Sequence, residues 1–218
     1  MSLKSYQRKF IEFAISNEIL SFGSFILKSG RESPYFFNVG KFNKGSALSA
    51  IGKFYADVLH DENQLDFDVV FGPAYKGIPL ASSTVIALSE HYKKDVPYSF
   101  NRKEIKDHGE GGNIVGAPLK GNILIIDDVI TAGTAIRESL AIIKENGATT
   151  VGIIVAVDRQ ERGTGEVSAI QQIKQDYDIP VMSIINLDLI IQYLNEKGGY
   201  DEHLSNMKKY RDIYGIKK

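Results

Sequence analysis

The chain has 218 residues, of which 43% are hydrophobic and 24% are charged, a composition typical of a globular domain with its own core. The formal net charge of −1 argues against a generic nucleic-acid or membrane-surface binder, so any anion site must be local. The absence of cysteine excludes disulfides, thiolate nucleophiles and cysteine-ligated metals. The four histidines show no metal-ligand spacing. The N-terminus lacks the apolar centre of a signal peptide, so we expect a cytoplasmic protein.

The hydrophobic pattern divides the chain into a short first region and a long second one. The first region contains a helix that ends near Asn17 and two strands at residues 22–27 and 35–38, separated by a polar turn. From Ser46 onward, helices alternate with nearly apolar strands. The strands are expected at residues 68–71, 97–101, 122–127, 150–157 and 181–185, and the helices at about 46–59, 76–91, 134–146, 167–174, 187–195 and 201–214.

This alternation predicts an α/β fold in which a central, mostly parallel sheet is flanked by helices on both faces. We expect a single domain over residues 1–218, with about residues 1–40 forming a small N-terminal hood over one edge. In open parallel sheets, ligands bind at the carboxyl ends of the strands. The turns that follow the predicted strands are therefore where chemistry is expected.

The turn after the strand at residues 122–127 has the composition of a sugar-phosphate site. Asp127 and Asp128 end the strand, and a T-A-G-T sequence opens the next helix. Small residues let backbone N–H groups converge on an anion, and the helix N-terminus adds partial positive charge. Two carboxylates would repel a bare phosphate, but they suit a ribose 5-phosphate because its hydroxyls can donate to them. The predicted contacts are Asp127, Asp128, Val129, Ile130, Thr131, Ala132, Gly133, Thr134 and Ala135.

Two other interpretations compete at this turn. A single aspartate at a strand end often serves only as a turn or capping residue, which is the alternative for Asp128. The strand end is also compatible with a Walker B strand, but that site requires a P-loop. Residues 72–78 have the glycine spacing of a P-loop without the Lys-Ser/Thr that follows it. The sugar-phosphate interpretation is favoured because it accounts for the whole string.

The string at residues 123–135 resembles the phosphoribosyl pyrophosphate (PRPP) motif of the type I phosphoribosyltransferase family: four hydrophobic residues, two acids and a T-x-G-T loop. Three further segments resemble the orotate-specific branch of that family. Residues 27–38 are similar to its base-binding segment, residues 71–79 to its pyrophosphate loop and residues 102–111 to its mobile catalytic loop. The resemblance implies the type I fold. It also implies transfer of a phosphoribosyl group from PRPP to orotate, giving orotidine 5′-monophosphate and pyrophosphate in pyrimidine biosynthesis.

The resemblance also implies a role for each matching position. The implied orotate contacts are Lys28, Phe36, Phe37, Thr131 and Arg159, while Tyr75 and Lys76 join the 127–135 turn in binding PRPP. The implied catalytic residues are Arg102, Lys103, Lys106 and His108 of a mobile loop at about 102–116, together with Asp128. A flat anion suits aromatic rings beside cations, and a guanidinium fork fits a carboxylate. Only one of two adjacent phenylalanines can face a given side of a strand.

In the family the mobile loop reaches across a two-fold interface. The resemblance therefore implies a homodimer in which Arg102, Lys106 and His108 act at the neighbouring subunit's site, while Lys103 serves its own. Mg²⁺ is expected as a cofactor, held mainly by the PRPP diphosphate and water rather than by a protein metal site. No nucleic-acid or membrane partner is expected.

Two alternatives share the same PRPP motif. A purine or other-base phosphoribosyltransferase would give no reason to gather Lys28, Phe37 and Arg159 at the base site, because a neutral purine does not call for cations. A PRPP-sensing regulator would lack an intact catalytic loop and would carry a DNA-binding module. This sequence keeps the loop, and we expect no room for the module.

Overall fold

The computed structural model describes residues 3–62, 65–106, 112–163 and 165–216. The elements in chain order are α1 (Ser5–Ser16), β1 (Leu20–Ile26), β2 (Glu32–Phe37), the short 3-10 helix η1 (Val39–Lys41), α2 (Gly45–Glu62), β3 (Val69–Gly72), α3 (Gly77–Tyr92), β4 (Tyr98–Lys106), β5 (Gly112–Gly116), β6 (Asn122–Asp127), α4 (Thr134–Glu145), β7 (Thr149–Asp158), α5 (Ala169–Tyr177), β8 (Val181–Asn186), α6 (Leu187–Lys197) and α7 (Asp201–Tyr214). The predicted succession of helices and strands is confirmed, apart from one segment described below.

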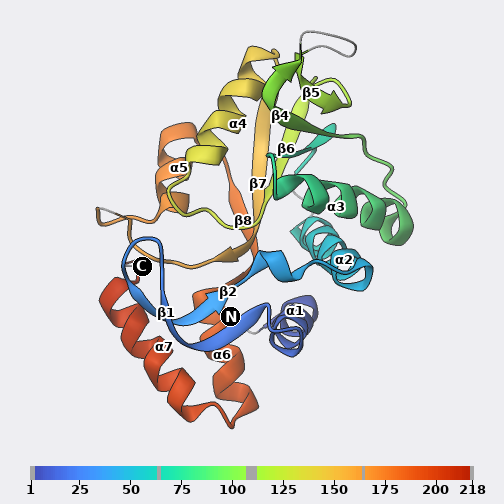
Figure 1. Cartoon of the computed structure of the whole chain (residues 1–218). Helices are drawn as coiled ribbons and strands as arrows, with labels where there is room; N and C mark the ends of the chain where they lie inside the picture. Colours follow the sequence, from blue (N-terminus) through green and yellow to red (C-terminus); the bar gives the residue numbers. More distant parts are fainter. Residues whose placement is uncertain (1–2, 63–64, 107–111, 164, 217–218) are drawn as a thin grey trace.

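A six-stranded sheet forms the centre of the molecule, with the strand order β5-β4-β3-β6-β7-β8 (Figure 1). All neighbouring pairs are parallel except β4 with β5. Helices α4 and α5 cover one face, where Ile125 of β6 shares a hydrophobic cluster with Ile136 and Ile173. Helices α2, α3 and α6 cover the other face, where Leu124 shares a cluster with Tyr55. The predicted α/β fold is confirmed, and β6 lies at the centre of the sheet.

The hood combines the beginning and the end of the chain. Strands β1 and β2 pair antiparallel, with Leu20 opposite Phe37, and β2 packs against α7 (Figure 1). The ring of Tyr35 on β2 meets the ring of Tyr210 on α7 edge to face, at a centroid distance of 6.3 Å. The sequence indicated an N-terminal hood only. The structure adds α7, because a two-stranded sheet needs a partner that buries its apolar face.

The predicted mobile loop at about 102–116 begins and ends in regular structure. Strand β4 continues to Lys106, and β5 returns antiparallel to it, with Phe100 opposite Val115 and Lys106 opposite Gly112. Residues 107–111 lie outside the described residues. The hydrophobic pattern missed this hairpin because residues 102–106 are mostly charged, while β5 is short, begins and ends with glycine and has no fully buried position, so the usual period-2 signal is weak.

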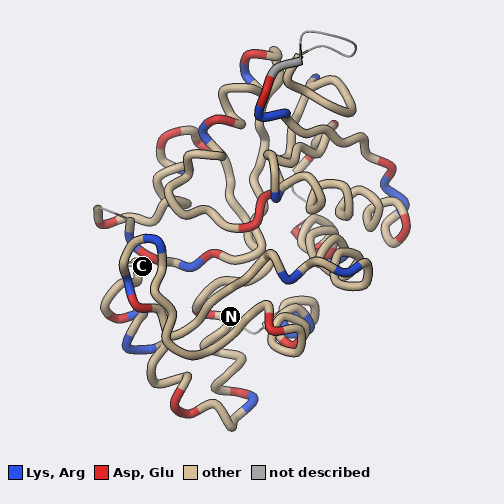
Figure 2. Tube along the Cα trace, in the orientation of Figure 1, with Lys and Arg blue, Asp and Glu red and all other residues tan. Residues whose placement is uncertain are grey.

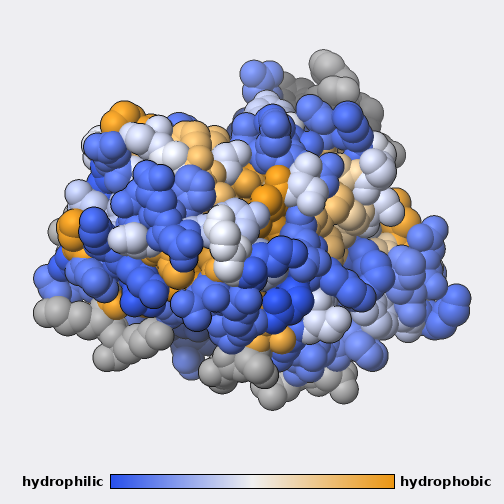
Figure 3. Space-filling view, turned by 90° about the horizontal axis from the view of Figure 1, so that it is seen from below, coloured by the Kyte–Doolittle hydropathy of each residue, from blue (hydrophilic) through white to orange (hydrophobic). Residues whose placement is uncertain are grey.

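None of the described helices combines the length and the apolar character needed to cross a bilayer. Seen from below, the surface is mainly hydrophilic, and its apolar side chains form small separate patches (Figure 3).

The closest approach between α2 and α3 depends on Gly52. A Cβ at this position would lie 2.3 Å from the carbonyl oxygen of Ser83, which is backbone and cannot move aside independently. We expect Gly52→Ala to destabilise the protein by at least about 2 kcal/mol through overpacking. Gly45→Ala is the matched control, because a Cβ at the first position of α2 meets nothing within 4 Å. Thermal unfolding of both variants tests this, and equal melting temperatures would contradict it.

Candidate functional site

The sugar-phosphate turn lies at the carboxyl edge of the sheet, between the end of β6 and the beginning of α4. Thr131, Ala132 and Thr134 are exposed there. Gly133 adopts φ 75°, and the N-terminus of α4 has no side-chain cap. The backbone N–H groups of this first turn are thus left for an external partner, and a helix N-terminus with such groups favours an anion. We call residues 127–135 the cradle.

Two buried carboxylates stand at the entrance of the cradle. Asp127 is 8% exposed and Asp128 is 6% exposed. An Asp127 carboxylate oxygen accepts from the Asp128 N–H at 2.9 Å, and the Asp127 carbonyl accepts from the Tyr55 hydroxyl at 2.7 Å. Burial, together with the nearby negative charge of Asp128, raises the pKa of Asp127 to about 7. Two desolvated carboxylates side by side favour ligands that donate hydrogen bonds or carry positive charge.

The segment after β3 brings a cation to the same place. The Lys76 Nζ lies 2.8 Å from a carboxylate oxygen of Asp128. This approach requires a tight turn, in which a Cβ on Gly72 would lie 2.2 Å from the carbonyl oxygen of Gly77. Asn101 of β4 fixes the turn by accepting from the Ala74 N–H at 2.9 Å. Tyr75, the other predicted PRPP contact in this segment, is 71% exposed.

The end of β7 and the hood meet around Arg159. Its Nε and Nη2 donate to one carboxylate oxygen of Glu161 at 2.8 and 2.6 Å, and Nη2 also donates to the Ser33 hydroxyl at 3.2 Å. The guanidinium lies over the ring of Tyr35, 4.4 Å from its centroid. Burial by itself disfavours the charge, but Tyr35 and Glu161 raise the pKa of Arg159 above its ordinary value. Arg159 is therefore a fixed, fully charged group.

The two predicted phenylalanine contacts lie on opposite sides of β2. Phe36 is 38% exposed and stacks on Phe25 with a centroid distance of 5.6 Å. Phe37 is 8% exposed, and its ring packs against those of Phe10 and Phe42 in the core. The alternation of a strand decides this outcome, and it leaves Phe36 as the ring available to a ligand. Lys28 is exposed in the turn between β1 and β2.

The predicted catalytic loop is described only at its base. The Lys103 Nζ lies 3.5 Å from a carboxylate oxygen of Glu138 on α4. An Nη1 of Arg102 donates to the Gly112 carbonyl at 3.5 Å across the hairpin. Lys106 ends β4, but its side chain lies outside the described residues, as does all of His108. The structure thus brings Lys103 near the beginning of α4 and leaves the position of the other two groups open.

Three supporting residues were missed by sequence reasoning. Tyr55 and Asn101, named above, each hold a backbone group of the site from a different element. Arg137 of α4 donates to the Ala132 carbonyl at 2.8 Å, which draws that oxygen away from the position where the cradle would hold an anion. No local pattern marks these residues, because each acts on a segment that only the fold brings near.

Charges of both signs alternate along the trace (Figure 2), so electrostatic binding must come from local groups. Two hollows of the described surface lie away from the cradle. One of about 450 Å³ is lined by Arg31, Arg162, Glu166 and Tyr214, and one of about 690 Å³ lies beside α6 and α7. Neither includes a residue of the cradle, whose exposed backbone rather than a deep cavity makes it a candidate site.

The raised pKa of Asp127 makes stability depend on pH. The folded state holds this proton more tightly than the unfolded chain, so stability falls as pH rises from the ordinary value of 3.8 to about 7. Asp127→Asn removes this loss. We expect it to stabilise the protein more at about pH 8 than at about pH 5, by at most roughly 3 kcal/mol, and so to raise the melting temperature more at the higher pH. Calorimetry at both pH values tests this, and a pH-independent effect would contradict it.

Comparisons with known proteins place this geometry in a family. Residues 39–177 match the model of the phosphoribosyl transferase domain. The chain is 58% identical over 214 residues to an orotate phosphoribosyltransferase of Shigella flexneri, covering 98% of this chain and 100% of that protein.

Solved structures agree with this relationship. A crystal structure of orotate phosphoribosyltransferase from Francisella tularensis is 42% identical, with a TM-score of 0.86 over 95% of this chain and 99% of that one. An adenine phosphoribosyltransferase from Leishmania donovani, 16% identical with a TM-score of 0.55 over 83% of this chain and 80% of that one, shares the fold alone. With family model, relatives and site geometry in agreement, the chain belongs to the phosphoribosyltransferase family and, within it, to the orotate phosphoribosyltransferases.

Proposed function

We propose that several segments of the described structure act together to transfer the 5-phosphoribosyl group from PRPP to orotate. This reaction of pyrimidine biosynthesis forms the bond between C1 of the ribose and N1 of orotate, and it breaks the bond between C1 and the pyrophosphate oxygen. The observation that carries the proposal is the meeting of three segments at one sheet edge. They are the cradle after β6, Lys76 after β3 and Arg159 after β7.

The cradle is proposed to hold the ribose 5-phosphate. The backbone N–H groups at the start of α4 and the hydroxyls of the exposed Thr131 and Thr134 would donate to the phosphate, while Asp127 and Asp128 would accept from the ribose hydroxyls. Val129, Ile130 and Ala135 shape the same turn. Since Lys76 pairs with Asp128, PRPP binding would give each of them a new partner. The diphosphate would take Lys76, and the ribose would take Asp128.

Lys76, Lys103 and Tyr75 are proposed to contact the diphosphate within one subunit. Departure of pyrophosphate leaves positive charge on the ribose and negative charge on the leaving group. Orotate is already an anion and needs little help from a base, so positioning and charge stabilisation dominate. Closure of the 102–116 hairpin over the site would exclude water, which would otherwise capture the ribose carbon.

Mg²⁺ is the cofactor that this family uses with PRPP, and we expect it here. Within the described residues no group of three or more His, Cys, Asp or Glu side chains forms a metal site. Asp127 and Asp128 nevertheless fit a nearby cation, because they are adjacent carboxylates and burial penalises the negative charge of Asp127. Diphosphate oxygens and water would complete the shell. When bound, the ion supplies neutralisation of the diphosphate charge.

Orotate is proposed to lie between the hood and the end of β7. The exposed ring of Phe36 offers a face for the base, and the fixed guanidinium of Arg159 suits its carboxylate. Lys28 and Thr131 flank the same region from the hood turn and the cradle. Phe37 supports Phe36 from the core side of β2, with its ring engaged by other phenylalanines.

A homodimer is proposed to complete each site, with Arg102, Lys106 and His108 acting on the neighbouring subunit and Lys103 on its own. Strands β4 and β5 lie at one edge of the sheet (Figure 1). This edge position is consistent with a loop that reaches beyond its own subunit. We also propose that the protein is cytoplasmic, as expected from its sequence.

The decisive assay follows orotate absorbance in the presence of PRPP and Mg²⁺. We expect loss of the orotate band that depends on both additions, with no product from adenine or hypoxanthine. Turnover of a purine without turnover of orotate would contradict the proposal and favour the other-base alternative.

Asp128→Ala tests the role of the cradle carboxylate. We expect a loss in kcat/KM of at least about a hundredfold, since a ligand contact and a charge partner of Lys76 are removed together. We expect a much smaller relative loss of stability. Parallel measurement of turnover and of thermal unfolding distinguishes this from a capping role, in which the fold would weaken as strongly as the activity.

Subunit mixing tests the shared site. Lys106→Ala and Asp128→Ala homodimers should each be nearly inactive, and the mixture should regain part of the activity, up to about one intact site per mixed dimer. The control is a mixture of two separately tagged preparations of Asp128→Ala, which should regain none. If subunit exchange is verified by tags and activity stays absent, Lys106 acts within its own subunit.

A further inference from the structure

Glu161 is a partly buried carboxylate at the base end of the site, and the transfer reaction assigns no role to it. Its side chain is 13% exposed. One of its oxygens accepts from the Arg159 Nε and Nη2 at 2.8 and 2.6 Å, and the Tyr35 hydroxyl lies 3.4 Å from the same oxygen. The other oxygen lies 4.0 Å from the Arg31 Nη1. A carboxylate is rarely placed this deep unless its partners need it.

Arg159 is held on three sides, and Glu161 supplies the strongest of these contacts. The Tyr35 ring lies under the guanidinium plane, the Ser33 hydroxyl accepts at 3.2 Å, and Glu161 accepts along one edge. Glu161 and Ser33 take the N–H of Nε and both N–H groups of Nη2, which leaves the two Nη1 N–H groups to donate to a ligand carboxylate. The orientation of the guanidinium decides where these two donors point. Fixing that orientation before the ligand arrives avoids an entropy loss on binding.

The negative charge of Glu161 is compensated by its neighbours. Arg159 and Arg31 both lie within 4.0 Å of its carboxylate oxygens, so the repulsion that Glu161 would exert on an anionic base is reduced. Loss of the Glu161 acceptor would instead leave Arg159 buried without its main partner, which favours its rotation toward water.

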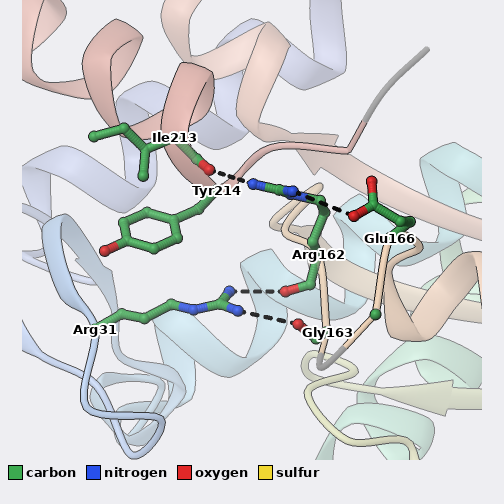
Figure 4. Close-up of a pocket in the computed structure, with 7 residues that line it drawn as sticks. Arg31, Arg162, Gly163, Glu166, Ile213 and Tyr214 are labelled. Atoms are coloured by element: carbon green, nitrogen blue, oxygen red, sulfur yellow. Dashed lines mark hydrogen bonds and ion pairs between the residues drawn. The ribbon is translucent and has the colours of Figure 1, made fainter.

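Arg31 links this cluster to the rest of the hood. Its guanidinium donates to the carbonyls of Arg162 and Gly163 at 2.8 and 3.1 Å and lies over the Tyr214 ring at 5.0 Å. Figure 4 shows Arg31 reaching across the hollow toward these carbonyls, with Tyr214 of α7 beside it. The hood, the segment after β7 and α7 therefore meet at one set of contacts.

We propose that Glu161 is a positioning residue for the base: it holds the Arg159 guanidinium in the orientation that receives the orotate carboxylate. This inference rests on the proposed function of Arg159 as an orotate contact. Glu161 itself touches neither substrate, so its effect must be confined to the ligands that carry the base, namely orotate and orotidine 5′-monophosphate.

The test measures KM for all four reactants, in the forward direction for orotate and PRPP and in the reverse direction for orotidine 5′-monophosphate and pyrophosphate. We expect Glu161→Ala to raise KM for orotate and for orotidine 5′-monophosphate by roughly tenfold or more, because a buried charge pair loses one partner. KM for PRPP and for pyrophosphate should change by less than about twofold. Glu161→Gln keeps the acceptor oxygen and should restore most of the affinity for both base-carrying ligands.

Matched variants separate the inference from the proposed function. Glu166→Ala removes a nearby carboxylate that pairs with Arg162 rather than with Arg159, and it should leave all four constants unchanged. Arg159→Ala alone should raise KM for orotate, and adding Glu161→Ala to it should raise this constant no further. If Arg159→Ala has no effect on orotate, the proposed orotate contact fails. If it has an effect but Glu161→Ala has none, only the present inference fails.

Stability is measured alongside, because a carboxylate with several partners could be purely structural. If all four constants change together in Glu161→Ala, the positioning role is wrong. Should that variant not fold, Glu161→Asp replaces it, since this change keeps the charge and withdraws the acceptor. Glu161→Asp should raise KM only for orotate and for orotidine 5′-monophosphate. A lowered KM for orotate in Glu161→Gln would overturn the inference, because it would show that the main effect of Glu161 is to repel the anionic base.

Discussion

The structure depends on β6 being hydrogen-bonded on both sides. This strand runs parallel to β3 on one side and to β7 on the other, and its side chains from Ile123 to Ile126 are fully buried. A strand held in this way cannot shift its register, because a shift of one residue would exchange its two buried faces. Asp127 and Asp128 are therefore carried to a fixed position at the sheet edge, where burial raises the pKa of Asp127.

Three cations of the site are paired with carboxylates. Lys76 pairs with Asp128, Arg159 with Glu161 and Lys103 with Glu138. Of these three pairs, only Arg159 and Glu161 are both largely withdrawn from water, so the loss of one partner there would cost free energy. The Lys76 and Lys103 side chains are exposed, and exposed pairs contribute little stability. The three pairs differ in kind: Lys76 and Asp128 are both proposed to contact PRPP, whereas Glu161 is proposed to stay in place and orient Arg159.

The hood shows how tertiary packing selects among residues of similar type. Phe36 and Phe37 are adjacent and chemically identical, yet one ring is available at the surface and the other belongs to the core. Strand alternation predicts that they differ, but which of them faces inward depends on α1 and the phenylalanines packed there. In the same way α7, from the far end of the sequence, supplies Tyr210 and Tyr214 against the hood.

The sequence by itself determined the α/β fold, the strand at residues 122–127 and the cradle that follows it, because these are local patterns of apolar runs, small residues and acids. Its resemblance to the family also implied roles for Lys76 and Arg159, which follow the two strands on either side of β6. Only the tertiary structure decided that residues 102–106 and 112–116 pair as a hairpin, that α7 closes the hood, and that Glu161 holds Arg159. These depend on contacts between segments far apart in the chain, and neither hydrophobic period nor motif spacing carries information about such contacts.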